Sequence, residues 1–381
     1  MTFRKSIFWL HLVAGLVAGL VIAIMCITGT ALAFEKEIIA YTERDARRVT
    51  PPAPDAPRLP LAELLARVRT AHPAARPDGI VLQNDPHAAV AFTAGRQATF
   101  YANPYTGEIR EPASTRTRDT LKLLVDWHRV LALGGDQRPV GKAITGACNL
   151  AFFVLAVTGL YLWWPRKWRT KGLRRSVWFV RRPADAKARD WNWHNVIGLW
   201  TAPVLIVLTL TALPISYRWA GQMLFTLTGT PPPPPTAATS APTAELVPPY
   251  PDWPPLSAET LITIAQQQFP TWKTLTYRAG TTQPATTAIR TADSWPRTAN
   301  TTLSLNPFTG EILKRAGYAE LNAAQQLRSW TRYLHTGEAL GWPGQLVAGL
   351  ASLGGCILVY TGFALAWHRW RRWRSSPSAP G

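Results

Sequence analysis

The chain has 381 residues, and its 41 Lys and Arg against 22 Asp and Glu give a net charge of +19. A hydrophobic content of 47% excludes a disordered chain, and the length is sufficient for two or more domains. All three cysteines lie inside long apolar runs and none forms a C-x-x-C pair, which excludes a disulfide-stapled secreted scaffold and a structural zinc motif of that kind.

Four apolar segments are long enough to cross a bilayer, because a spanning helix needs about 20 residues. The predicted spans, in chain order, are 7–34, 140–164, 196–217 and 343–367. The first segment also resembles a cleaved signal peptide, with a basic start and Ala31-Leu32-Ala33 as a cleavage site. Its apolar stretch exceeds the 7–15 residues, roughly, of a signal core, which favours a retained span.

The basic residues predict how the chain crosses the membrane. They gather before the first span, in the loop 165–195 and in the tail 368–381, and ten of them lie between residues 166 and 190. The positive-inside rule then places both termini and this loop in the cytoplasm. We therefore expect a multi-pass protein whose partner is the lipid bilayer, in the inner (cytoplasmic) membrane if the chain is bacterial, and no nucleic-acid partner.

Two segments, 35–127 and 218–335, are then expected on the periplasmic side. The first contains Asn-Pro-Tyr-Thr-Gly-Glu-Ile at 103–109, and the second contains the same motif with Phe for Tyr at 306–312. Pro and Gly favour a tight turn, so each motif is expected to close a hairpin. A strand-like stretch precedes each turn, at Ala98–Ala102 and Thr301–Leu305.

A helical pattern also lies upstream of each turn, at Leu61–Ala71 and at Leu256–Phe269. Both periplasmic segments are therefore predicted to be the same small α+β module. The second module follows a proline-rich run that begins at Pro231, which favours a semi-rigid extended spacer.

The spans carry a repeat of their own. In the first and third spans, a histidine is followed by glycine four residues later and by threonine seventeen residues later. The second and fourth spans carry Thr-Gly near their ends, and a histidine precedes each of these spans. The matching residues are His11, Gly15 and Thr28 with His194, Gly198 and Thr211, and His128, Thr158 and Gly159 with His335, Thr361 and Gly362. Two copies inserted in the same direction imply a pseudo-twofold axis along the membrane normal.

This axis predicts that His11 meets His194 near the cytoplasmic side and that His128 meets His335 near the outer side. Paired imidazoles inside an apolar helical bundle suit axial ligation of haem iron. Another metal is an alternative, although zinc normally needs three or four protein ligands. Plain structural histidines, hydrogen-bonded to neighbouring helices, are a second alternative.

The remaining histidines have no matching partner in the repeat. His72 and His87 are interpreted as surface loop residues. His368 is interpreted as an interfacial residue beside arginines, or as an alternate iron ligand on the cytoplasmic side.

Two haems bound in this way would lie near opposite faces of the membrane, because the 17 residues from His11 to Thr28 rise about 26 Å in a helix. This layout suits electron transfer across the membrane. Four basic residues lie close enough in sequence to be candidate partners for haem propionates: Arg4, Lys5, Arg129 and Arg332.

Taken together, the repeated spans, the two turn motifs and the four histidines resemble the PepSY-associated transmembrane family, over essentially the whole chain. The resemblance implies a bundle of four transmembrane helices from two parallel repeats, with two small α+β PepSY-like periplasmic modules. Ferric-siderophore reductases within this family imply two b-type haems per chain and one-electron reduction of Fe(III) in a periplasmic ferric siderophore. Thr211-Ala212 in the third span departs from the Thr-Gly pattern.

The electron donor stays open between a quinol, a flavoprotein and a reduced nicotinamide. No catalytic acid, base or nucleophile is expected beyond the haems. Two other functions compete with the reductase: a non-enzymatic membrane protein whose modules bind peptides or regulate a protease, and a permease. The permease is disfavoured, because the chain has only four spans and no matching pair of interrupted helices that could form a transport path.

Overall fold

The computed structural model describes residues 2–94, 98–112, 115–164, 178–181, 185–232, 246, 248, 250, 253–280, 283–296 and 299–375. Most of the predicted basic loop, most of the proline-rich spacer and the end of the predicted tail lie outside the described residues. The chain divides into two compact units. The helical unit comprises Met1–Glu35, Asp119–Leu224 and Leu327–Gly381, and the sheet unit comprises Lys36–Arg118 and Phe225–Gln326.

Four long helices form the helical unit and are long and apolar enough to cross a membrane. They are α1 (Phe3–Leu32), α6 (Arg138–Trp163), α8 (Ala186–Ser216) and α12 (Trp342–Ser375). Helix α8 begins ten residues before the predicted span, where the Asp185 side chain accepts a hydrogen bond from the Ala188 N–H and caps the helix. Helix α12 continues past the apolar run through an Arg-rich stretch, since arginine is a good helix former.

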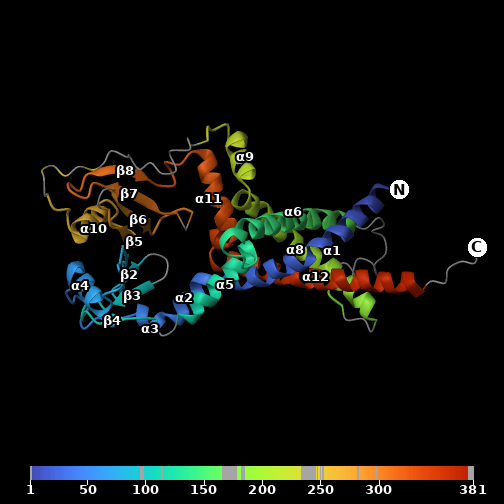
Figure 1. Ribbon diagram of the computed structural model, residues 1–381, viewed down its shortest axis with the longest axis horizontal. Helices are drawn as coiled ribbons and strands as arrows, with labels where there is room; N and C mark the ends of the chain where they lie inside the picture. Colours follow the sequence, from blue (N-terminus) through green and yellow to red (C-terminus); the bar gives the residue numbers. More distant parts are fainter. Residues whose placement is uncertain are drawn as a thin grey trace, which may run out of the picture. The chain divides into compact units, whose positions relative to one another are not determined.

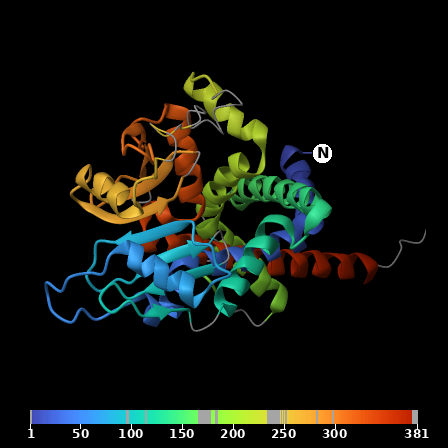
Figure 2. The same cartoon turned by 60° about the vertical axis from the view of Figure 1, so that its left-hand side comes forward.

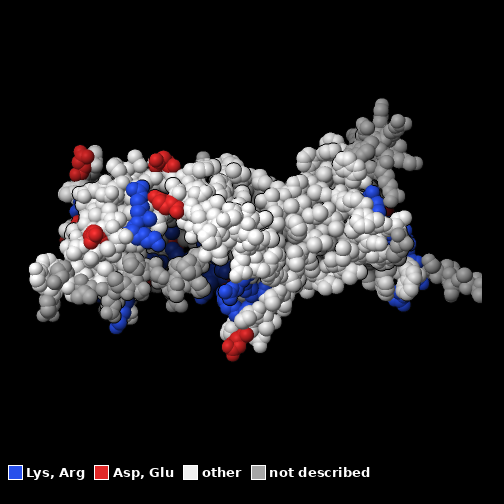
Figure 3. Space-filling view, turned by 90° about the horizontal axis from the view of Figure 1, so that it is seen from above, with Lys and Arg blue, Asp and Glu red and all other residues white. Residues whose placement is uncertain are grey.

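The outer surface of these helices is apolar. Val17 on α1 is 80% exposed, and many other large apolar side chains of the four helices are exposed as well. On the face in Figure 3, the middle of the bundle is uncharged, and Lys and Arg gather at the end where the chain termini lie. A soluble protein rarely exposes an apolar surface of this extent, so the unit is an α-helical membrane protein.

The bundle is closely packed where small residues meet. Helices α1 and α8 each pack against both α6 and α12. A Cβ placed on Gly355 of α12 would lie 2.6 Å from Cys26 Sγ of α1, so only glycine allows this approach. Figure 1 shows α12 running alongside its neighbours, and Figure 2 shows it continuing beyond them at its C-terminal end.

Short helices lead into the second and fourth long helices. Helix α5 (Arg116–Val130) and η1 (Gly135–Gln137) precede α6, and α11 (Ala323–His335) and η3 (Glu338–Leu340) precede α12. The remaining short helices are α2 (Glu35–Thr42), α3 (Arg44–Arg47), α4 (Leu61–Ala71), α9 (Arg218–Thr228) and α10 (Ala258–Gln267). The order of long helix, module, short helix and long helix therefore occurs twice, as the repeat predicts.

The sheet unit contains one antiparallel sheet in the order β4-β3-β2-β1-β5-β6-β7-β8. Its strands are β1 (Gly79–Gln83), β2 (Val90–Ala94), β3 (Ala98–Ala102), β4 (Ile109–Arg110), β5 (Trp272–Arg278), β6 (Ala285–Thr291), β7 (Thr301–Leu305) and β8 (Ile312–Ala316). The sequence predicts two modules; the structure joins them, because β1 pairs with β5 from Gly79↔Arg278 to Gln83↔Thr274. Helices α4 and α10 share one apolar core with the sheet.

Both turn motifs close hairpins, as predicted. Gly107 and Gly310 have φ near +75°, the left-handed region that favours glycine. In the first turn, Asn103 Oδ1 accepts a hydrogen bond of 2.9 Å from the Tyr105 N–H, and Asn306 does the same for Phe308. The repeated asparagine is thus explained by an Asx turn.

Candidate functional site

Two pairs of histidines meet inside the helical unit, in the combinations that the repeat predicts. His11 of α1 and His194 of α8 have ring centroids 6.4 Å apart, with an interplanar angle of 84°. His128 of α5 and His335 of α11 have ring centroids 6.2 Å apart, with an interplanar angle of 54°. Each pair therefore brings together one imidazole from each half of the repeat.

Hydrogen bonds fix three of these imidazoles to threonines. His11 Nδ1 lies 2.9 Å from Thr158 Oγ1, and His194 Nδ1 lies 2.9 Å from Thr361 Oγ1. His128 Nδ1 lies at the same distance from the hydroxyl of Thr28. The threonines are the landmarks of the sequence repeat, and the structure gives them a common role.

These contacts determine which ring nitrogen carries the proton. Each threonine hydroxyl already donates to a carbonyl in its own helix, for example Thr28 Oγ1 to Ile24 O at 2.7 Å and Thr158 Oγ1 to Val154 O at 2.7 Å. The hydroxyl oxygen therefore accepts from the imidazole, so the proton is on Nδ1 and Nε2 keeps its lone pair. This is the usual arrangement of a metal-binding histidine, whose second nitrogen is held by an outer partner.

The fourth imidazole is held differently. His335 Nδ1 donates 2.9 Å to the backbone carbonyl of Leu208, and the hydroxyl of Thr211 donates to Val207 O and to Leu208 O. Thr211 matches Thr28, but Ala212 follows it where Gly29 follows Thr28. A carbonyl can only accept, so His335 has the same tautomer with Nε2 unprotonated.

Burial keeps the second pair neutral. Desolvation and the nearby His335 lower the pKa of His128 to about 4, and desolvation also lowers the pKa of His335. Neutral imidazole is the form that binds a metal ion. Both residues are thus in the ligating form at neutral pH.

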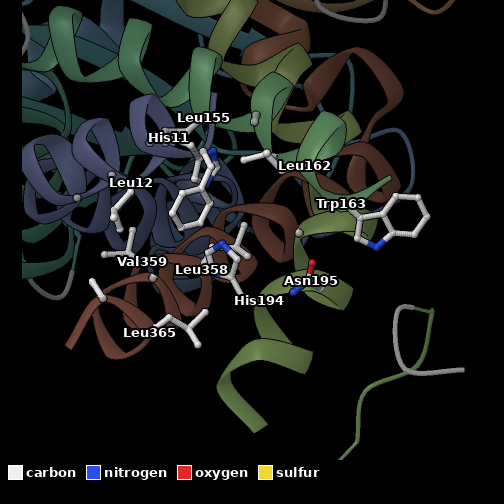
Figure 4. Close-up of a pocket in the computed structure, with 18 of the residues that line it drawn as sticks. His11, Leu12, Leu155, Leu162, Trp163, His194, Asn195, Leu358, Val359 and Leu365 are labelled. Atoms are coloured by element: carbon white, nitrogen blue, oxygen red, sulfur yellow. The ribbon is translucent and has the colours of Figure 1, made fainter. Parts of the chain in front are cut away.

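A cavity of about 810 Å³ surrounds the His11–His194 pair. Figure 4 shows both imidazoles among the apolar side chains that line it, including Leu155 and Leu358. Glycines of all four long helices line the same cavity: Gly15, Gly19, Gly159, Gly198, Gly355 and Gly362. The two His-x3-Gly motifs are explained in this way, because residues four apart share one helix face and the glycine leaves room beside the imidazole.

Basic side chains also line this cavity. Arg4 and Lys5, both expected to face haem propionates, are among them, together with Lys187, Arg369 and Arg372. The Arg4 guanidinium donates to the carbonyl of Trp164 at 3.2 Å. Arg129 and Arg332, the other two candidates, lie on α5 and α11, the helices that carry the second pair.

The other histidines make their contacts with residues outside the two pairs. His368 Nε2 is 3.7 Å from Asp190 Oδ2, so in this structure it contacts a carboxylate and not the His11–His194 pair. His72 Nε2 lies 3.1 Å from Glu111 Oε1, and the ring stacks on Phe100. The exposed His87 donates its backbone N–H to Asp85.

The geometry of both pairs fits a bis-histidine haem. Two imidazoles that bind one metal ion through Nε2 have ring centres roughly 6 Å apart, because each metal–nitrogen bond is about 2.0–2.1 Å and both ring radii add to it. The described residues contain no group of three or more His, Cys, Asp and Glu that could hold a metal ion, so the donor set does not suit zinc. An apolar cavity with basic residues suits a flat, apolar cofactor that carries carboxylates.

The fold and these sites define a class: an α-helical membrane protein with four candidate spans, two α+β modules and two pairs of partly buried histidines. The chain belongs to the PepSY-associated TM region family, which it matches over residues 8–369, nearly its whole length. No curated protein matches the sequence at a significant level.

Proposed function

We propose that this protein is a di-haem reductase of the bacterial inner membrane that passes electrons from the cytoplasmic side to a periplasmic ferric siderophore. The observation that carries the proposal is the state of the four imidazoles. Each is partly buried, each is held through Nδ1, and each leaves the Nε2 lone pair available within a pair of suitable separation. Haem b, when bound, would supply a one-electron carrier at each pair.

The two pairs are separated along the span. His11 lies near the start of α1, and Thr28, which accepts the hydrogen bond from His128, lies near its end. Seventeen residues of helix rise about 26 Å, close to the thickness of the hydrocarbon layer. In the proposed topology both termini are cytoplasmic, so the His11–His194 pair receives electrons and the His128–His335 pair delivers them to the periplasmic side.

The substrate class rests on the resemblance to ferric-siderophore reductases of the FoxB type. Fe(III) is held tightly by hard oxygen ligands, and these ligands hold Fe(II) less tightly because it carries less charge. One-electron reduction is therefore enough for iron release. The protein's own residues would hold the haems and shield them from water. No side chain needs to form a covalent bond to the substrate.

The test uses the full chain purified in detergent after haem-replete expression. The protein is reduced with a stoichiometric amount of dithionite and mixed without oxygen with a ferric trihydroxamate and a chromogenic Fe(II) chelator. We expect re-oxidation of the haem bands together with formation of the Fe(II) complex. His128→Ala should lose both signals, and His87→Ala, an exposed control of the same residue type, should retain them.

Two results contradict this proposal. A colourless protein would favour a membrane protein whose modules bind peptides or regulate a protease. A coloured protein whose haem stays reduced in the presence of the ferric chelate would support the haem sites. It would contradict ferric siderophores as the substrate class.

A further inference from the structure

A buried carboxylate lies in the same helix as His194. Asp190 of α8 is only 2% exposed, although it belongs to a helix that is long and apolar enough to span a membrane. Its Oδ1 atom lies 2.8 Å from Arg189 Nη2, and its Oδ2 atom lies 3.7 Å from His368 Nε2 of α12. Burying a carboxylate is costly unless it is paired, and the Arg189 guanidinium pairs with one oxygen of this carboxylate.

The contact leaves one nitrogen of His368 available. Nε2 faces the carboxylate, and Nδ1 makes no hydrogen bond to any residue within the described part of the chain. The side chain is 32% exposed. At 3.7 Å the contact is at ion-pair distance and is not a hydrogen bond, and the second ring nitrogen is accessible to a hydroxyl group that gives up its proton, as a general base requires.

This base lies next to the His11–His194 pair. Asp190 precedes His194 by four residues, so both lie on one face of α8 about 6 Å apart along the helix axis. The hydrogen bond from His194 to Thr361 and the contact of Asp190 with His368 both join α8 to α12. A proton acceptor therefore lies beside the place where electrons enter in the proposed function.

Aromatic side chains are exposed around His368. Trp367 and Trp370 are 55% and 41% exposed, and their rings lie 4.8 Å apart on α12. Trp191, next to Asp190, is 42% exposed. Flat, accessible indole faces at the end of a membrane helix suit a planar aromatic ligand that arrives from the lipid.

We propose that Asp190 and His368 form the proton-accepting site for a lipid-soluble hydroquinone, which is the electron donor of this protein. The inference rests on the proposed function, because the electrons pass to the His11–His194 pair. Oxidation of a hydroquinone to the quinone releases two electrons and two protons. The electrons leave one at a time toward the pair.

The protons leave the two hydroxyl groups of the hydroquinone in turn. In each case the O–H bond breaks and an N–H bond forms at His368 Nδ1, while Asp190 stabilises the charged ring. His368 is exposed enough to pass the first proton to water before it accepts the second. A hydride donor such as a nicotinamide releases no hydroxyl proton and needs no such base.

The experiment follows the reduction of the haem bands in the purified full chain by duroquinol without oxygen, next to reduction by dithionite. We expect wild-type protein to respond to both reductants. His368→Gln should slow the duroquinol reaction about 100-fold, the typical worth of a general base, and leave the dithionite-reduced spectrum unchanged. His87→Gln is the control and should match wild type.

Asp190 acts through His368 and is a positioning residue. Asp190→Asn should also slow duroquinol reduction, and Asp190→Glu, which restores the carboxylate, should recover part of the rate. If Asp190 serves only as a structural partner of Arg189, its variants should change the haem content or the dithionite-reduced spectrum. They should then affect reduction by duroquinol and by dithionite alike.

The outcomes separate the two proposals. If His368→Gln reacts with duroquinol at the wild-type rate, the donor site is wrong and the reductase stands. The same holds if the wild-type haem bands respond to a reduced flavin or nicotinamide and not to duroquinol. If the wild-type protein contains no haem, the proposed function fails and the donor site fails with it.

Discussion

The two histidine pairs differ in how their imidazoles are held. At the His11–His194 pair, both Nδ1 atoms contact threonines, and a glycine follows each threonine. At the His128–His335 pair, Thr28 plays this role on one side, and the Leu208 carbonyl replaces it on the other. The difference coincides with Ala212, which stands where the other three copies have glycine. All four imidazoles thus carry their proton on Nδ1, although for His335 the hydrogen-bond acceptor is a backbone carbonyl and not a threonine hydroxyl.

The largest expected effect comes from removing an imidazole. His11→Ala and His194→Ala should each remove one of two haems, and His128→Ala and His335→Ala should each remove the other, because a bis-histidine site needs both axial ligands. Haem per chain, measured by absorption of the purified protein, should fall by about half in every single variant. A double variant that lacks both histidines of one pair should lose no more haem than either single variant. Loss of both haems from one substitution would show that the pairs are not independent sites.

A graded series of glycine substitutions tests how closely each imidazole is packed. A Cβ at Gly29 would lie 3.2 Å from His128 Cε1, one at Gly159 would lie 3.4 Å from His11 Cε1, and one at Gly362 would lie 3.7 Å from His194 Cε1. Gly29→Ala should therefore weaken haem retention most and Gly362→Ala least, with overpacking of about 1–3 kcal/mol at the tightest position. Haem dissociation rates give the measurement. The opposite order would mean that the alanine methyl groups do not act on the imidazoles.

The threonines provide a matched comparison between the two halves. Thr28→Val removes the acceptor of His128 Nδ1–H at nearly constant volume, and outer-partner changes of this kind typically cost about 10–100-fold in metal affinity. Thr211→Val changes the matching residue of the other half, whose hydroxyl makes no direct contact with His335, and should have a smaller effect. Haem affinity from titration of the apo protein distinguishes them. Equal losses in both variants would contradict the assigned acceptors.

The smallest expected effect is that of Ala212→Gly. The substitution restores the Thr-Gly pattern and allows His335 to approach Thr211 as His128 approaches Thr28. We expect both haems to remain bound. The stability of helix α8 should fall by up to about 1 kcal/mol, the usual cost of replacing alanine with glycine in a helix. The electron paramagnetic resonance signal of the haem at the second pair should shift, while that at the first should not. A shift at the first pair would contradict the placement of Ala212.

Much of this arrangement follows from sequence because the chain is duplicated. Matching histidines in two halves with the same direction must face each other across the axis, so the pairs were predictable without coordinates. The hairpins were predictable for a local reason, since Asn, Pro and Gly at fixed positions determine a tight turn. The strands Ala98–Ala102 and Thr301–Leu305 and the helix Leu61–Ala71 have the predicted bounds.

Other features depend on contacts that no local pattern encodes. The pairing of β1 with β5 joins residues about 200 positions apart, and neither strand differs in pattern from one at the edge of a sheet. The partner of His335 is a backbone carbonyl, which has no sequence signal. Asp190 has no signal of its own in the sequence, because the apolar run predicts a helix that begins only at residue 196. The threonines are landmarks of the repeat, and their positions relative to the histidines are the signal for their role as hydrogen-bond partners.

We propose that each pair of imidazoles holds one haem b, and a count of haem per chain tests this proposal. The full chain, expressed with excess haem and purified in detergent, is converted to its pyridine haemochrome and compared with the protein concentration from amino-acid analysis. We expect two haem b per chain, both low-spin in the oxidised protein because both axial positions would be imidazoles. A featureless spectrum, or a single haem that survives the loss of either pair, would contradict it.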